Sequence, residues 1–280
     1  MPIIADMHSH STASDGVDSP ARVVERAAER GLKVLALSDH DTIDGVAEAR
    51  AAGERLGVTV VPAVELTCYL GKAEIHMLGF GIDIDSAELA EHCEKFVAAR
   101  EERARIIGQR LAELGVPIDM DEVVAKCDGG VVGRPHIGKA LLDAGHVSTL
   151  QEAFDKYLAN GQPACVPKLM VEPKLAIDLI HAAGGIAVMA HPGLGDQFHL
   201  IPQLAQMGLD GVEVHHSKHG KDEEAKAQSA VDLHGLVKTG GSDCHGKLGE
   251  REELLGRWGL DEGEWKAVAK RLESTAAFVG

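Results

Sequence analysis

Short apolar runs alternate with amphipathic segments along most of this sequence, and that alternation is its strongest constraint on the fold. The apolar runs that we expect to form strands lie at 3–7, 34–38, 58–65, 74–80, 186–189, 211–214 and 236–240. Helical patterns separate most of them; the first begins at Ser19 and Pro20, a typical helix start, and the second ends at Gly57. Repeated strand–helix units of this kind predict a parallel α/β barrel.

One stretch of the chain breaks this rhythm. A long charged helix is expected over residues 86–115, and further helical patterns follow it before the alternation resumes near residue 172. We therefore predict that residues 1–97 and 168–280 form the barrel. Residues 98–167 are expected to form a helical cap, inserted beside the strand ends.

Composition and charge limit the partners. Acidic residues outnumber basic ones by 44 to 28, and the net charge of −16 disfavours long nucleic acid, whose binding needs neutralised phosphates. A local group of cations could still hold a small phosphorylated ligand.

The five scattered cysteines include no C-x-x-C pair, which predicts a reducing cytoplasm and no disulfide framework. Without a signal-peptide pattern or a long apolar run, neither export nor a membrane span is expected. No pattern indicates an oligomeric state.

Histidines and carboxylates gather where the predicted strands end. Asp6, His8 and His10 alternate at the end of the first strand and would share one face, which places two imidazoles beside a carboxylate. Comparable residues end or follow the other strands: His40, Glu65, His76, His191, Asp243 and His245. Asp15, in a loop, could reach the same place. The strand ends of an α/β barrel form a single rim, so this coincidence favours a metal site over separate structural roles.

The order of these motifs resembles that of a known family. The strings DMHSHSTASDG, SDHDT, AHP and GSDCH, with Glu65 and His76 between them, are similar to the PHP (polymerase and histidinol phosphatase) family of the wider amidohydrolase group. The resemblance covers about residues 3–95 and 170–250 and fills every expected ligand position. It implies a distorted (β/α)7 barrel with two or three divalent metal ions.

The resemblance also implies how the ligands divide among the metals. One metal would take His8, His10, Glu65 and Asp243; a second would share Glu65 and add His76 and His191; a third would take Asp15, His40 and His245. Imidazole and carboxylate ligands without thiolate suit manganese, iron or zinc better than calcium. We expect manganese, with iron, zinc and magnesium as alternatives.

Metals held in this way would perform the chemistry without a side-chain nucleophile. They would bind phosphate oxygens and lower the pKa of a water, so that hydroxide attacks phosphorus in line with the leaving oxygen. Ser9, Ser38, Ser242 and Cys244 adjoin the motifs, but strand alternation is expected to turn them away from the ligands. The ligand residues are therefore also the predicted catalytic residues.

The predicted cap supplies candidate substrate-binding residues. Pro135 suits the first turn of a helix, which places Arg134 and His136 at a helix N-terminus, where anions are attracted. Arg134 can bind a phosphate through two parallel hydrogen bonds, although it could instead form an ion pair with a surface carboxylate. Lys168, where the chain re-enters the barrel, is either another phosphate-binding cation or an ordinary surface lysine. Three further histidines follow the strand at 211–214 and either line the pocket or are bystanders with no part in it, the second being our interpretation: His215, His216 and His219.

The expected reaction is hydrolysis of a phosphate monoester in a small nucleotide, above all a nucleoside 3′,5′-bisphosphate. The segment GRPHIG resembles the capped PHP branch that acts on nucleotides and RNA ends, and a second phosphate would explain a cationic cap. A 5′→3′ exoribonuclease for short RNA and a histidinol phosphatase are the alternatives that the resemblance allows. A non-catalytic metal-binding regulatory module is the alternative of another class, although no expected ligand is missing.

Overall fold

The computed structural model describes residues 1–126, 132–167, 169–246 and 254–275. It contains two compact units, Met1–His92 with Met170–Gly280 and Cys93–Leu169. The predicted insertion at 98–167 falls within the second unit. Lys168 lies outside the described residues.

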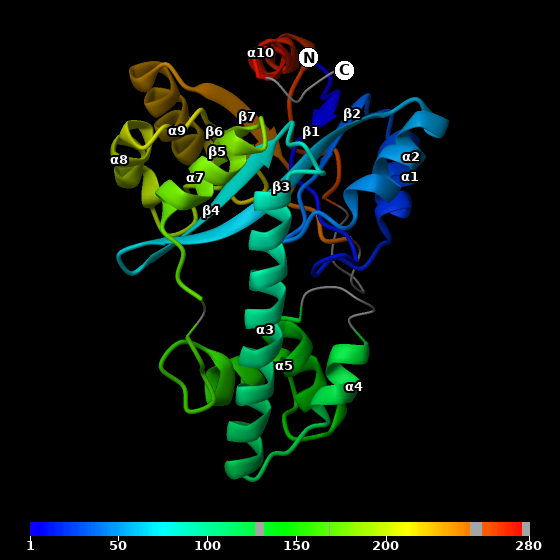
Figure 1. Cartoon of the computed structure of the whole chain (residues 1–280), viewed down its shortest axis with the longest axis vertical. Helices are drawn as coiled ribbons and strands as arrows, with labels where there is room; N and C mark the ends of the chain where they lie inside the picture. The colour runs from blue at the N-terminus through cyan, green and yellow to red at the C-terminus, as the bar shows by residue number, and fades with distance from the viewer. Residues whose placement is uncertain (127–131, 168, 247–253, 276–280) are drawn as a thin grey trace. The chain divides into compact units, whose positions relative to one another are not determined.

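The first unit is built on a seven-stranded sheet whose strands follow one another in chain order (Figure 1). The strands are β1 (Ala5–Asp6), β2 (Val34–Leu37), β3 (Thr59–Leu70), β4 (Ala73–Phe80), β5 (Ile186–Met189), β6 (Gly211–His216) and β7 (Val237–Gly241). The backbone N–H of Met7 donates to the carbonyl oxygen of Gly240 at 3.2 Å, which brings the end of β1 beside β7. The predicted α/β barrel is confirmed as a nearly closed, distorted one.

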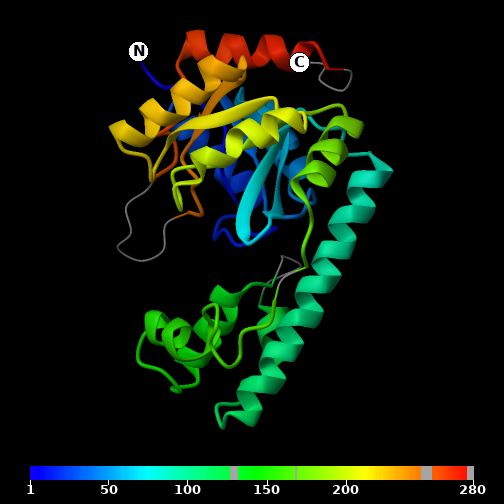
Figure 2. The same ribbon diagram turned by 90° about the vertical axis from the view of Figure 1, so that its left-hand side faces the viewer.

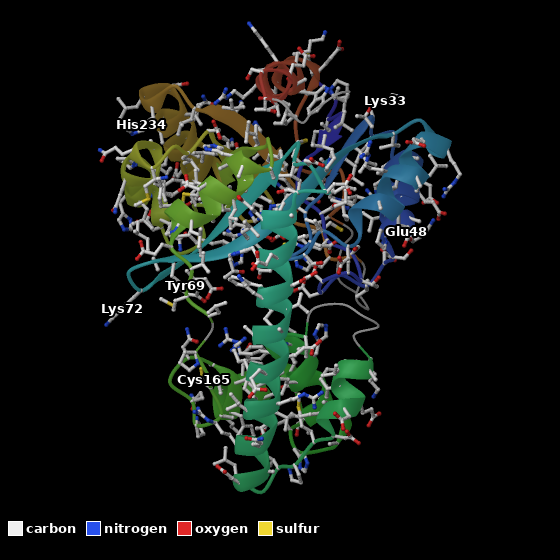
Figure 3. All side chains as sticks on the ribbon, viewed as in Figure 1. Lys33, Glu48, Tyr69, Lys72, Cys165 and His234 are labelled. Atoms are coloured by element: carbon white, nitrogen blue, oxygen red, sulfur yellow. The ribbon has the colours of Figure 1, made fainter. Side chains whose placement is uncertain are left out.

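The distortion is centred on β4. This strand runs antiparallel to both β3 and β5, whereas the other neighbouring pairs are parallel. Only Gly71, with φ of 62°, and Lys72 separate β3 from β4, and a parallel return would need a crossover of about a dozen residues or more. The all-parallel sheet predicted from the alternation is therefore wrong at this strand. Figure 3 shows Tyr69 and Lys72 at the far end of the hairpin.

Helices cover the outside of the barrel, with α1 and α2 on one flank and α7, α8 and α9 on the other (Figure 1). They are α1 (Pro20–Glu29), α2 (Val46–Leu56), α7 (Pro173–Ala182), the 3₁₀ helix η2 (Gln197–Leu200), α8 (Ile201–Gln206) and α9 (Lys221–His234). Two predicted helix ends are confirmed. The Ser19 hydroxyl accepts the backbone N–H of Arg22 at 3.3 Å, and Gly57 ends α2 with φ of 71°, a conformation that glycine adopts readily.

The last helix, α10 (Glu262–Glu273), lies across the barrel end at which the parallel strands begin (Figures 1 and 2). Its residues Val268 and Leu272 join the inward-facing strand residues in one buried apolar cluster. Arg271 of α10 also donates to the buried Asp210, which precedes β6. One end of the barrel is thereby filled with apolar side chains, and the polar residues lie at the other end.

The second unit is helical and has its own core. It contains most of α3 (Ala87–Glu113), which begins in the first unit, followed by α4 (Met120–Ala125), α5 (Arg134–Asp143), α6 (Leu150–Ala153) and the π-helix η1 (Phe154–Leu158). Buried apolar residues of α3, α5 and η1 pack together, among them Leu111, Leu141 and Leu158. Among the residues that the structure describes, no helix combines the length and the apolar character that crossing a membrane requires.

Candidate metal centre

The structure gathers all the predicted ligand residues at the barrel end where the parallel strands finish. Each comes from a strand or from the segment that follows one: His8, His10 and Asp15 after β1, His40 after β2, Glu65 in β3, His76 in β4, His191 after β5, and Asp243 and His245 after β7. The sequence places these residues up to 237 positions apart, from His8 to His245, and the barrel closes them into one cluster.

Glu65 is the centre of this cluster and is fully buried. Five ring nitrogens lie within 3.2 Å of its two oxygens: those of His8, His10 and His40 near Oε2, and those of His76 and His191 near Oε1. Burial raises the pKa of Glu65, but the surrounding imidazoles, His40 foremost, outweigh it and hold the pKa well below its usual range. A buried carboxylate with imidazoles at both oxygens has the arrangement of a bridging metal ligand.

Asp243 supplies the second carboxylate. Its Oδ1 lies 3.2 Å from Nε2 of His10 and 3.5 Å from Nε2 of His8. The backbone of Asp243 has φ of 54°, a conformation that is rare outside glycine and that is often found at functional sites. The donor atoms of the first predicted metal set, His8, His10, Glu65 and Asp243, all lie within 4.8 Å of one another.

A second group of donors adjoins the first. Asp15, His40 and His245, together with His10, also have ligand atoms within 4.8 Å of one another. Nε2 of His245 lies 3.2 Å from Oδ1 of Asp15. Burial raises the pKa of Asp15, but His40 and His245 outweigh it and hold the pKa well below its usual range. Since His10 belongs to both groups, the two candidate sites share a side chain.

The side chains of the second predicted set, Glu65, His76 and His191, also lie together. His76 and His191 lie 2.8 and 3.2 Å from Oε1 of Glu65. His40 belongs here too, because its ligand atom lies within 4.8 Å of those of Glu65 and His76. His40 therefore stands between this set and the group around Asp15.

Several buried ring nitrogens in the cluster have no hydrogen-bond partner within the described part of the chain, and this bears on whether the residues suit a metal. Both ring nitrogens of His10 and Nδ1 of His40 are buried, and none has a hydrogen-bond partner of good geometry among the described residues. Buried polar atoms without partners are costly. A divalent cation would satisfy nitrogens and carboxylate oxygens that converge in this way, so the donor set fits a metal centre of imidazole and carboxylate type.

Two carboxylates of the SDHDT motif, missed in the sequence, hold the loops in place. Asp39 accepts hydrogen bonds from the backbone N–H of Ser11 at 2.7 Å and from the hydroxyl of Ser14 at 2.6 Å, which fixes the loop that carries Asp15. Asp41 accepts the backbone N–H of Thr67 at 2.7 Å and so ties the segment after β2 to β3. Both carboxylates are therefore engaged with neighbouring loop and strand groups, whereas His40 between them faces Glu65.

Asp6 does not orient an imidazole, contrary to the shared face predicted for it. Its carboxylate accepts backbone N–H groups of His8, Ser242 and Gly256 at 3.3, 2.9 and 2.8 Å. Burial raises the pKa of Asp6 to about 6 against these hydrogen bonds. The alternation fails because β1 ends at Asp6, so the residues that follow are no longer in an extended strand.

Glu213 and His216 of β6 are buried members of the cluster that the sequence did not identify. Oε1 of Glu213 lies 3.1 Å from Nδ1 of His8, and Nε2 of His216 lies 3.4 Å from Oδ2 of Asp243. The bystander interpretation is therefore wrong for His216. A β-bulge between Glu213 and His215 explains the omission, because it turns residues three apart toward the same side.

The remaining histidines of this segment stay outside the cluster. His215 pairs with Glu224 at 2.9 Å, and His219 accepts the backbone N–H of Gly193 at 3.0 Å. The side chains next to the ligands are turned away, as predicted: the hydroxyl of Ser9 donates to a backbone carbonyl oxygen, and Cys244 packs in an apolar cluster.

In the second unit, Arg134 and His136 lie at the start of α5. Nη1 of Arg134 donates to the carbonyl oxygen of Leu158 at 3.1 Å and to Oδ1 of Asn160 at 3.0 Å, so these contacts are not the surface ion pair considered above. The ring of His136 accepts the backbone N–H of Gly133 at 3.0 Å. Substrate binding by these residues stays a prediction, as it does for Lys168, which lies outside the described residues.

Comparison with known proteins agrees with this geometry. The family model for the PHP domain matches residues 6–159. A 3′,5′-nucleoside bisphosphate phosphatase from Chromobacterium violaceum is 37% identical over 86% of each chain. The 5′-3′ exoribonuclease Rnm of Escherichia coli is 34% identical over 87% of this chain and 85% of its own.

A solved structure from Bifidobacterium adolescentis, provisionally described as a metal-dependent phosphoesterase, has a TM-score of 0.86 and 30% identity over 95% of this chain and 96% of its own. The predicted class, a metal-dependent phosphoric ester hydrolase, agrees with these relatives and with the clustered donors. The chain belongs to the PHP family.

Proposed function

We propose that this protein is a phosphatase that removes one phosphate from a nucleoside 3′,5′-bisphosphate. The observation that carries the proposal is the placement of Glu65 between five imidazoles, with Asp243 and Asp15 completing adjacent donor groups. The bisphosphate substrate is supported by the Chromobacterium violaceum relative, which bears that activity in its name and is 37% identical.

In this proposal the donor groups hold two or three divalent cations. His8, His10, Glu65 and Asp243 would hold one, Glu65, His76 and His191 a second, and Asp15, His40 and His245 a third. When bound, such cations polarise phosphate oxygens and lower the pKa of water. We propose manganese, because the donors are imidazole and carboxylate. We also propose a cytoplasmic location, because the cysteines are scattered and form no C-x-x-C pair.

The chain's own residues would orient the phosphate ester and hold protons in place. Glu65 would keep the cations adjacent through its two oxygens. The Nδ1 atom of His216 accepts the backbone N–H of Lys218 at 3.1 Å, so Nε2 carries the proton of the neutral ring and faces the cluster. Such an N–H could donate to a phosphate oxygen.

The second phosphate of the substrate would bind to the residues at the start of α5. Both hydrogen bonds of Arg134 use Nη1, and the guanidinium has further donors on Nε and Nη2. His136 and Lys168 are the other proposed contacts.

A second candidate function, 5′→3′ trimming of short RNA, is supported by the Escherichia coli relative at 34% identity and would use the same donors for a terminal phosphate.

Phosphate release from three substrates tests the proposal. Adenosine 3′,5′-bisphosphate, a 5′-phosphorylated RNA trinucleotide and histidinol phosphate would be compared at equal concentration with Mn²⁺. The proposal expects the largest kcat/KM on the bisphosphate. A higher value on the trinucleotide, with release of mononucleotides, would favour the exoribonuclease, and no turnover of any substrate would favour the non-catalytic alternative.

A further inference from the structure

The buried carboxylate of Glu213 has a position that the proposed metal sets do not use. Its side chain is 1% exposed, and both oxygens are engaged. Oε1 lies 3.1 Å from Nδ1 of His8, and Oε2 accepts the backbone N–H of His191 at 2.9 Å. One side chain of β6 therefore contacts a ligand residue that follows β1 and another that follows β5.

The contact with His8 determines which ring nitrogen of that imidazole carries the proton. Nε2 of His8 faces the cluster, 3.2 Å from Glu65 and 3.5 Å from Asp243. With Glu213 accepting at Nδ1, the proton of the neutral ring lies on Nδ1, and the lone pair of Nε2 points at the cluster. A carboxylate in this position fixes the tautomer and the ring orientation of a metal-binding histidine.

The contact with His191 acts on the backbone. His191 has φ of 27°, a conformation that a residue with a side chain rarely adopts. Such a conformation persists only where the surroundings hold it. The hydrogen bond from its N–H to Glu213 is one such restraint, and it fixes the direction from which the ring of His191 approaches Glu65, 3.2 Å away.

We propose that Glu213 is a positioning residue that sets two metal ligands at once, the ring of His8 and the backbone of His191. The inference rests on the metal-binding part of the proposed function and not on its substrate. It separates Glu213 from the cation ligands, although the donor atoms of His8, Glu213 and His216 lie within 4.8 Å of one another.

Glu213→Gln tests the proposal on the full-length chain. A glutamine has a single accepting oxygen, so it can serve His8 or His191 but not both. After metal removal, Mn²⁺ binding would be measured by titration calorimetry, and the visible absorption of the Co²⁺-loaded protein would report ligand geometry. We expect Mn²⁺ affinity to fall about 10–100-fold, the range typical of residues that support metal ligands, and the Co²⁺ spectrum to change.

Glu224→Gln is the matched control. Glu224 of α9 makes the same kind of contact, 2.9 Å from Nδ1 of His215 in β6, but His215 lies outside the cluster. Its Mn²⁺ affinity should equal that of the unaltered protein. An equal fall in both variants, or unchanged affinity and spectrum in Glu213→Gln, would overturn the proposal.

A double substitution checks that Glu213 acts through its partners. In a His8→Ala background the effect of Glu213→Gln should shrink, because only the His191 contact is left to lose. An undiminished effect would contradict the inference. If the variants bind Mn²⁺ as described but the unaltered protein hydrolyses no phosphate ester, the proposed function is wrong and the role of Glu213 is unaffected. If the unaltered protein binds no metal, both proposals are wrong.

Discussion

Oε1 of Glu65 and Nδ1 of His76 lie 2.8 Å apart across the only hairpin of the described barrel sheet. Glu65 faces Leu78 directly in the β3–β4 register, so His76 is its diagonal neighbour on the same side of the sheet. Burial lowers the pKa of His76, but Glu65 outweighs it and raises the pKa to about 9. The antiparallel hairpin thus places an imidazole of β4 beside the central carboxylate of β3.

Removal of this central carboxylate should abolish turnover without unfolding the protein. In Glu65→Gln the five surrounding imidazoles would keep their places but lose the bridging charge. We expect kcat to fall by more than about 100-fold, beyond the range of residues that only support ligands, and His191→Ala to behave similarly. Phosphate release would be measured beside circular dichroism. A folded, active Glu65→Gln enzyme would show that the bridging role is wrong.

Metal removal gives an independent prediction. The purified protein should contain at least two transition-metal ions per chain by elemental analysis, since the cluster offers several overlapping donor groups. Dialysis against a chelator should abolish hydrolysis, and Mn²⁺ should restore it. Full activity in protein shown to be metal-free would exclude the proposed mechanism.

Arg134 tests the substrate. If it binds the phosphate that is not cut, Arg134→Ala should lower kcat/KM for a bisphosphate by about 10–100-fold, the equivalent of one charge-assisted hydrogen bond. A simple phosphate monoester should be affected little. The ratio between the two substrates cancels damage from the lost contacts to Leu158 and Asn160.

Arg105→Ala is the control for Arg134, because Arg105 is an exposed arginine of the same unit, paired only with Asp121 among its described hydrogen bonds. It should leave both rates unchanged. Equal losses on both substrates in Arg134→Ala would mean that the arginine holds the scissile phosphate or supports its own helix.

The end of the barrel that α10 covers gives a prediction about the stability of the fold. Buried Asp210 accepts hydrogen bonds from Arg271 and from the backbone N–H of Ala187, and lies 2.7 Å from Nε2 of His181. Asp210→Ala should lower the free energy of unfolding by about 3 kcal/mol, because it leaves a buried N–H without its partner. Asp178→Ala, which removes an exposed pair with Lys174, should change it by less than about 1 kcal/mol in the same urea titration.

The candidate ligands could be grouped from the sequence because most of them lie in a strand or within a few residues of its end. His40 follows β2 and His191 follows β5 within a few residues, so local patterns were enough to place them on the rim. Local patterns could not show which residues pair across the barrel. The contact between Asp39 and Ser11, and that between Glu213 and His8, join segments distant in the sequence.

One helix was missed and one strand was given the wrong direction, each for an identifiable physical reason. Helix α9 buries only Ala227 and Val231, so it lacks the apolar stripe by which helices are found. The direction of β4 depended on the two-residue turn at Gly71 and Lys72, a hairpin length that outweighs the parallel rhythm of the strands around it.

The split of the barrel into two chain segments has a consequence for folding. Residues 81–185 separate β4 from β5, so a ribosome making roughly 5–20 residues per second would expose four strands for about 5–20 s before the fifth emerges. Contacts between distant segments are slow to form. His191, Asp243 and His245 all lie in the later segment, so the nascent chain can bind metal with its full donor set only after the final strand has been made.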